Sequence, residues 1–582
     1  MLCFRKIILI AGIFGALTCE MTQCKGTATS LGKETAEATY HQLPSFYDKL
    51  PQTPKGGTFY DLLRGDPKTI NPILNTEAFS SQVSGALFMS LMNLDPENLN
   101  FLPALATSYK ISADKLSYTF FLNPEATWDD GSQVTSEDVE FTLNTILNPA
   151  THAAMQRSYW EGISIKVHDK TTFTFKVPEV KFNTLINLSG FQPVQKKQFA
   201  NTKNFNEDPG ILNPVGNAAY KLTKYMRSQQ IEFTRKKNWW GYNYKHFAQT
   251  YNFDSIILKI IPDINLSYER FIRGEIHSLQ FTSEIWSTKV TNIDRDKYAF
   301  SLKKTEKKLR ALQLTNDTPK PYMYIGLNLK NPIFKDVNTR KALAHLIDYE
   351  KMSEKVFFNL WTQCFSPFGS QSLNSAPELR DKHNRIQFDR AKAIQILKQS
   401  GWQLNKQNLL SKMIDGKMNN FEFTLEVPSI APALLKISQI FQEDLKKTGI
   451  KMNIKAVEWN SLLSSLEEKK FEAVIIGWRS SLFPDPKQIF HSSSAERGGS
   501  NYISYANPKV DSLILNANRE LDIQKRALIM QEINRILYAD QVYLFLFEQK
   551  FALEGLNAKI KTHYPIAKYE NGTGSDRYYF SR

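Results

Sequence analysis

The stretch "IKMNIKAVEWNSLLSSLEEKKFEAVIIGWRSSLFPDP", residues 450–486, decides the fold class. Residues 450–459 and 471–478 predict two strands, and the ten residues 461–470 between them predict a helix. The second strand is almost wholly apolar, as is typical of a strand in a sheet that helices cover on both faces. The stretch therefore predicts an α/β fold built from β–α–β units.

Each of these two predicted strands ends with a tryptophan, Trp459 in the first and Trp478 in the second. Parallel strands would bring both rings to one edge of the sheet, where the loops of α/β folds often form binding sites. Two interpretations fit this spacing equally well. The tryptophans are either the aromatic walls of a ligand cleft or two residues of the core.

The rest of the chain also has the pattern of an α/β fold, with predicted strands and helices alternating over most of its length. Residues 115–123 and 171–177 alternate apolar and polar side chains, as half-buried strands do. Between them, Thr135 and Asp138 have the spacing of a capping box at the start of a helix. A chain of 582 residues is too long for one core, so we expect two or three domains.

The N-terminus is predicted to be a signal peptide, residues 1–19. Arg5 and Lys6 precede the apolar stretch 7–17, and small residues follow. We therefore expect a periplasmic or otherwise extracytoplasmic protein. Cys19 follows "GALT", an imperfect lipobox, so lipidation of Cys19 and ordinary cleavage between Cys19 and Ala28 stay open. The lipid would be the chain's link to a membrane.

Charge and cysteine content narrow the class of partner. The formal net charge is +15, but basic and acidic residues are interspersed, which indicates a solvated basic surface rather than a nucleic-acid site. Four cysteines are too few for a disulfide framework. We expect Cys364 to be a buried free thiol.

Motifs for catalysis and metal binding are missing. The chain has no G-x-S-x-G elbow, no phosphate-binding G-x-x-x-x-G-K-[ST] loop and no closely spaced pair of histidines. Asp129 and Asp130 in "WDDG" could suggest the carboxylate pair of a glycosidase, but adjacent side chains diverge and a turn is favoured. We expect no catalytic site, metal or cofactor.

Seven segments in order resemble the family-5 extracellular solute-binding proteins, the peptide-binding receptors of bacterial ABC importers. The similarity runs from about residue 55 to the C-terminus. The segments 53–59, 251–275 and 356–363 further resemble the branch that takes up longer peptides and peptide-nucleotide antibiotics such as microcin C. The seven segments are 67–112, 127–143, 213–222, 236–241, 332–348, 388–402 and 442–459.

This resemblance implies a type II periplasmic-binding-protein-like fold, with two lobes and three domains joined by a hinge and a ligand cleft between the lobes. The first domain would combine residues 50–92, 206–318 and 545–582, with a second domain, 93–205, inserted into it. Residues 319–544 would form the other lobe. A monomer of this kind captures oligopeptides or peptide-like solutes and delivers them to permease subunits in the inner membrane, without chemistry.

The resemblance also implies a set of ligand-binding positions. Trp459 and Trp478 would line the cleft, and the main chain at Gly477 and Arg479 would pair with an extended peptide, a mode that ignores side-chain identity. The full set is Phe79, Ser80, Tyr159, Trp459, Gly477, Trp478, Arg479 and Ser481.

Ser481 departs from the family. Many members have an aspartate three residues after the tryptophan, and it pairs with the ligand's α-amino group. A buried ammonium without a partner is costly, so the ligand could be blocked at its N-terminus, extend past the cleft or not be a peptide. Arg479 would suit a carboxylate or phosphate, and Asp485 is expected to shape its own loop.

Three other functions compete with peptide capture. An exported hydrolase acting on cell-wall peptides or glycans would need an activated nucleophile or a carboxylate pair, and neither is evident. The same fold could hold a nickel chelate, an opine or an oligosaccharide. An envelope chaperone would use the same cleft for unfolded segments.

Overall fold

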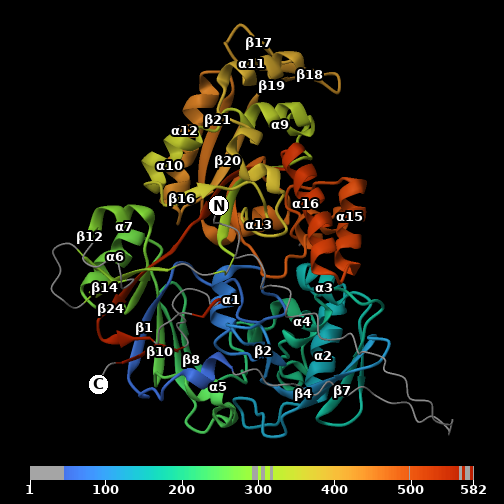
Figure 1. The fold of residues 1–582 in the computed structure, drawn as a ribbon, viewed down its shortest axis with the longest axis vertical. Coiled ribbons are helices and arrows are strands. Elements are labelled where there is room, and N and C mark those ends of the chain that lie inside the picture. The colour runs from blue at the N-terminus through green and yellow to red at the C-terminus, as the bar shows by residue number, and fades with distance from the viewer. Residues whose placement is uncertain are drawn as a thin grey trace, which may run out of the picture.

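A computed structural model describes residues 45–291, 299–302, 309–314, 317, 319–496, 499–562, 567–569 and 577–580. The predicted signal peptide and Cys19 lie outside the described residues. Within them, no helix has the length and apolar character needed to cross a bilayer. The chain folds into two lobes, an upper and a lower one in Figure 1.

The upper lobe is built on a six-stranded mixed sheet (Figure 1). Both β21 and β22 pair in parallel with β20, so the predicted β–α–β unit is present, with α13 (Trp459–Glu467) as its crossover helix. However, β20 lies between the two predicted strands. The strands in order are β16 (Trp361–Gln363), β23 (Tyr543–Gln549), β15 (Pro321–Leu327), β22 (Ala473–Arg479), β20 (Glu422–Pro428) and β21 (Lys451–Val457).

Helices cover both faces of this sheet, which explains the apolar run in β22. Ala473 and Ile475 belong to the core on one face, and Val474 and Ile476 to the core on the other. The first face is covered by α9 (Val337–Ala344), α10 (Tyr349–Phe357), α11 (Arg390–Gln399) and α12 (Pro432–Lys446). The second is covered by α13, α14 (Lys487–Phe490), α15 (Pro508–Arg519) and α16 (Ile523–Ala539).

Two sheets of the lower lobe join segments that are far apart in the chain. The four-stranded sheet pairs β1 (Thr58–Leu63) in parallel with β10 (Ser255–Ile260), next to β9 (Gln230–Arg235) and β8 (Tyr220–Met226). In the five-stranded sheet, β24 (Ala552–Asn557) pairs with both β11 (Ser278–Gln280) and β14 (Leu309–Leu314). β12 (Val290–Thr291) and β13 (Ala299–Leu302) complete it.

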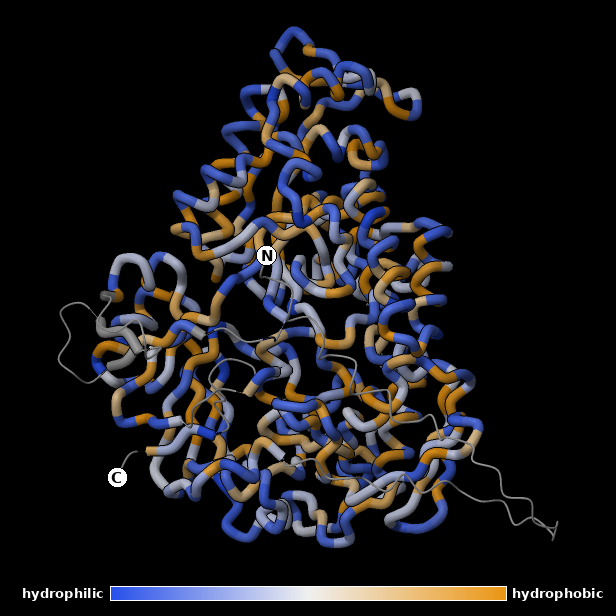
Figure 2. Tube along the Cα trace, viewed as in Figure 1, coloured by the Kyte–Doolittle hydropathy of each residue, from blue (hydrophilic) through white to orange (hydrophobic). Residues whose placement is uncertain are grey.

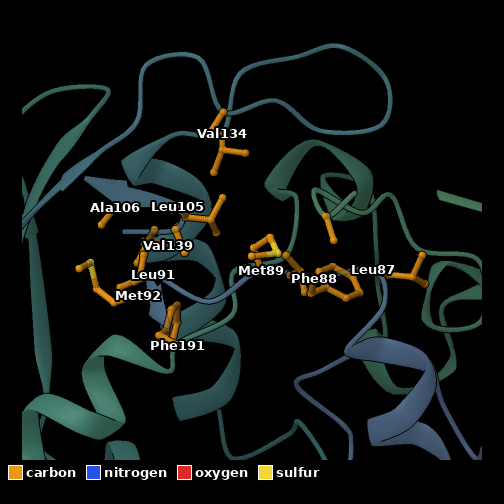
Figure 3. Close-up of a cluster of buried hydrophobic side chains, with 14 of the residues drawn as sticks. Leu87, Phe88, Met89, Leu91, Met92, Leu105, Ala106, Val134, Val139 and Phe191 are labelled. Carbon is orange, nitrogen blue, oxygen red and sulfur yellow. The ribbon is translucent and has the colours of Figure 1, made fainter. Parts of the chain in front are cut away.

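The remaining part of the lower lobe contains the sheet β4 (Ala106–Ile111), β5 (Ser117–Leu122), β7 (Thr172–Lys176) and β6 (Ser164–Val167). Beside it lie α2 (Ser136–Leu147), α3 (Ala154–Trp160) and α4 (Thr184–Ser189). The predicted capping box of Thr135 and Asp138 is present at the start of α2. Figure 3 shows the apolar core here, with Leu91, Leu105 and Val139 pointing toward one another.

Apolar residues gather inside each lobe, and polar residues dominate the outer turns (Figure 2). The chain passes from the lower to the upper lobe between β14 and β15 and returns between β23 and β24. Two of the expected domain limits fall inside strands, because 544/545 divides β23 and 92/93 divides β2 (Met92–Leu94).

Candidate ligand-binding site

A cavity of about 340 Å³ lies between the lobes. Its lower wall comes from α3 and α4, and its upper wall from the end of β22, the loop 480–486 and α14. The volume is at the lower end of the range of ligand pockets. Its lining residues include Gln156, Tyr159, Trp160, Asn183, Ile186, Asn187, Tyr322, Trp478, Arg479, Ser481, Phe483, Asp485 and Gln488.

The lower wall follows from helical periodicity. On α3, Gln156, Tyr159 and Trp160 are three and four positions apart, and residues 183, 186 and 187 at α4 repeat this spacing. Side chains so spaced lie on one face of a helix. Of these residues the sequence analysis named Tyr159 alone, although the same-face spacing on two successive helices was a usable signal for the rest.

The upper wall begins where β22 extends beyond its pairing with β20. β22 pairs with β15 as far as Arg479, whereas its register with β20 ends at Val474. A Cβ atom at Gly477 would lie 2.6 Å from the carbonyl oxygen of Tyr322, so glycine is needed for the close approach of β22 to β15. The edge of β22 that faces β20 extends past β20 toward the cavity.

Trp478, Arg479 and Ser481 all line the cavity, as Tyr159 does. The indole of Trp478 stacks on Tyr502, with ring centroids 5.6 Å apart and an interplanar angle of 12°. The hydroxyl of Ser481 accepts a hydrogen bond from the N–H of Phe483 at 3.1 Å, within its own loop.

Asp485 has two roles. Its Oδ1 accepts hydrogen bonds from the N–H of Lys487 at 2.9 Å and from Nδ2 of Asn518 at 3.0 Å, which fixes the loop as expected. The same residue lines the cavity, which the sequence analysis did not foresee. Burial raises the pKa of the Tyr159 phenol and the Asp485 carboxylate raises it further, so Tyr159 stays protonated and can donate a hydrogen bond.

The fold and the sequence match known proteins. The family described as bacterial extracellular solute-binding proteins, family 5 (middle), matches residues 100–501. The chain belongs to this family. The oligopeptide-binding protein AppA of Bacillus subtilis is 27% identical over 492 residues, covering 83% of this chain and 84% of AppA. The Escherichia coli protein YejA is 24% identical over 498 residues, covering 80% of this chain and 79% of YejA.

Solved structures confirm the predicted type II binding-protein fold. The structure of B. subtilis AppA in complex with a nonapeptide has a TM-score of 0.79 at 24% identity, covering 91% of this chain and 100% of that one. The structure of DppA of Helicobacter pylori in complex with the peptide STSA has a TM-score of 0.76 at 20% identity, covering 91% of this chain and 99% of that one.

In this family-5 protein, Trp459, Phe79 and Ser80 lie apart from the cavity lining. Trp459 begins α13, packs on Phe79 with ring centroids 5.5 Å apart, and has its Nε1 3.4 Å from Oε2 of Glu77. Ser80 is buried, and its Oγ accepts a hydrogen bond from the N–H of Thr69 at 3.2 Å. Trp459 and Phe79 thus form a separate contact between the lobes.

A second contact between the lobes adjoins the cavity. The N–H of Phe182 in the lower lobe donates to the carbonyl oxygen of Asn518 at 3.0 Å, and the guanidinium of Arg526 lies 3.4 Å from the centroid of the Phe182 ring. Arg519 also pairs with Glu179 at 2.6 Å. Because Asn518 holds Asp485, this contact joins the lobes directly behind the cavity wall.

The acid pair of "WDDG" is structural. Asp129 pairs with Lys236 at 2.7 Å and Asp130 with Lys197 at 3.0 Å, so the two carboxylates have different partners. Trp128 is buried at this turn, as predicted. The described residues contain no group of three or more His, Cys, Asp or Glu side chains that could hold a metal ion.

Proposed function

We propose that this protein is the extracytoplasmic substrate-binding receptor of an ABC importer, which captures oligopeptides or peptide-like solutes between its lobes. The observation that carries the proposal is the interlobe cavity walled by the end of β22, where that strand continues past β20. An extended peptide can add to such a strand edge through main-chain hydrogen bonds. The relatives named for oligopeptide binding support the same function.

Each part of the site has a role in this proposal. The main chain of β22 near Gly477 holds the backbone of the peptide, and the rings of Trp478 and Tyr159 form opposite walls. Amides on α3 and α4 provide adaptable hydrogen-bond partners, directly or through water. Closure of the lobes encloses the ligand by a hinge movement. Trp459 and Phe79 contribute to closure rather than to the cavity wall.

The proposal extends to the ends of the chain and to its partners. Residues 1–19 act as a signal peptide, with Cys19 as the alternative lipid anchor, and the exported monomer delivers its ligand to the permease in the inner membrane. Three domains form the two lobes, with the limits given above except that β2 and β23 each stay within one domain. The segments shared with the long-peptide branch favour peptides or peptide-nucleotide conjugates as ligands.

A thermal-shift experiment tests this function. Residues 25–582, expressed without the leader, are heated with pools of di- to nonapeptides, nickel–histidine, opines and oligosaccharides in separate samples. Ligand at 100 times its dissociation constant stabilises the native state by about 2.7 kcal/mol, which is easily measured as a rise in Tm. Peptide pools should produce that rise. A response to one of the other ligands, with none to peptides, would refute the proposal.

A second experiment identifies the ligand carried from the cell. Protein purified from its own envelope is analysed by native mass spectrometry, and we expect a bound species whose mass and fragments are those of peptides or peptide conjugates. Release of peptidoglycan fragments by the purified protein would instead favour the hydrolase.

A further inference from the structure

Three buried polar atoms in the upper wall of the cavity have no hydrogen-bond partner among the described residues. They are the hydroxyl oxygen of Tyr322, Oγ of Ser480 and Oε1 of Gln488, and all three residues line the cavity. Tyr322 is 2% exposed and Ser480 is 9% exposed. A buried polar group normally has a partner, because the loss of its contact with water is otherwise not offset. The three atoms therefore mark a place where a molecule other than the protein supplies hydrogen bonds.

The sheet explains why these atoms gather at one wall. Tyr322 on β15 lies directly opposite Trp478 on β22, and Ser480 follows β22 two positions after Trp478. Opposite residues, and residues two positions apart, project from the same face of a sheet. This face is covered by α14, which carries Gln488. Strand pairing and the covering helix thus bring the three polar groups together.

The wall that these three atoms form is electrically neutral. Arg479 precedes Ser480 in the chain, so it points to the opposite face of β22, and it is exposed. The carboxylate of Asp485 lies in the field of the buried Arg526 guanidinium. Burial raises the pKa of the Tyr322 phenol well above its usual value, so this hydroxyl stays protonated.

The donors and acceptors of the wall match an uncharged group that has both. The hydroxyls of Tyr322 and Ser480 can each donate and accept, and the side chain of Gln488 presents a carbonyl oxygen and an NH2 group. A primary amide on the ligand can pair with both hydroxyls and with either end of the Gln488 amide. A carboxylate or an ammonium would lose its hydration here without meeting an opposite charge. An apolar group would leave the three atoms unpaired.

We infer that Tyr322, Ser480 and Gln488 form a subsite for an uncharged polar group of the ligand, such as the side-chain amide of glutamine or asparagine. This inference rests on the proposed function. It adds selectivity for one side chain to the recognition of the peptide main chain, so the receptor prefers peptides that carry an amide at the position that meets this wall.

The experiment uses three matched series of alanine-based pentapeptides. Glutamine, glutamate or methionine occupies one position at a time, so that an amide, an acid and an apolar side chain of similar length are compared. Isothermal titration calorimetry measures each series with wild type, Tyr322→Phe and Ser480→Ala, which each remove one hydroxyl of the wall. Tyr220→Phe is the matched control, because Tyr220 is also 2% exposed but its hydroxyl donates to the carbonyl oxygen of Phe253 in the lower lobe.

At one position of the pentapeptide, wild type and Tyr220→Phe should bind the glutamine peptide about tenfold more tightly than its glutamate and methionine counterparts. Tyr322→Phe and Ser480→Ala should each reduce this preference to roughly threefold or less. Equal binding of the three series by wild type would overturn the inference, leaving ordered water as the occupant of this wall and the proposed function intact. A tenfold preference that persists in a folded Tyr322→Phe or Ser480→Ala protein would also overturn it. Binding of no peptide by wild type, in these series or in the peptide pools, would refute the proposed function itself.

Discussion

Replacing Phe182 with alanine tests whether the contact behind the cavity holds the lobes closed. The ring of Phe182 is half-buried in the lower lobe and lies 3.4 Å from the guanidinium of Arg526 in the upper lobe. Arg526 is itself buried, with 6% of its surface exposed. A desolvated cation–π pair contributes roughly 1–2 kcal/mol. The hydrogen bond from the Phe182 N–H to Asn518 does not depend on the side chain and should remain.

This free energy acts on the equilibrium between open and closed lobes. If ligand is held in the closed form, the apparent affinity is the intrinsic affinity reduced by the fraction of closed protein. Where the unliganded protein is mostly open, loss of 1–2 kcal/mol of closure energy weakens peptide binding by about 5- to 30-fold. Because the cavity lining itself is unchanged, the loss should appear for all peptides alike.

The assay combines calorimetry with small-angle X-ray scattering. Calorimetry gives the dissociation constant for a free-amino peptide pool, and scattering gives the radius of gyration with and without peptide. Phe388→Ala is the matched control, because Phe388 is also partly exposed, 37%, and lies 5.8 Å from Arg390 of the same lobe. Phe182→Ala binding within twofold of wild type, with an unchanged radius of gyration, would show that this contact does not govern closure.

Two further predictions concern buried groups. Burial lowers the pKa of His246 to about 4, below its unfolded value, so wild-type stability should fall as the pH drops from about 6.5 toward 4. His246→Gln should remove about 2 kcal/mol of the loss of stability between pH 7 and pH 4.5, measured by urea unfolding at both pH values. An unchanged loss would contradict the prediction. Burial and the Glu548 carboxylate raise the pKa of the Cys364 thiol, so an aromatic disulfide reagent at pH 8 should react only after unfolding. Reaction of the native protein would contradict this.

The fold was predictable where local pattern and burial agree. The apolar run 471–478 indicated a strand covered on both faces, and alternate residues of β22 do belong to two different cores. The buried, free state of Cys364 was also predicted correctly. The position of β20 between β21 and β22 was not predictable, because strand order is set by crossover connections and not by the period of either strand.

The site was predictable only in part. Trp478, Arg479 and Ser481 share one strand end, so a correct strand assignment places them together, and Tyr159 joins them in the structure. The pairing of Trp459 with Phe79 depends on how the lobes meet, which no local pattern contains. The same is true of Asp485. Its role in the loop was evident from the sequence, but its place in the cavity lining depends on how α3 of one lobe and α14 of the other come together.

An aspartate at position 481 tests whether the loop after β22 can recognise the ligand's α-amino group. Ser481 lines the cavity, and an aspartate there can accept the Phe483 N–H as Ser481 does, since Asp and Ser form the same kind of turn. Ser481→Asp should therefore bind free-amino peptides about tenfold more tightly than wild type does, measured by calorimetry, with no such gain for N-acetylated peptides. Ser481→Asn is the control, because it adds the amide without the charge. If Ser481→Asp binds free-amino peptides no better than this control while retaining its Tm, position 481 does not face the ligand's amino group or the ligand is not a peptide.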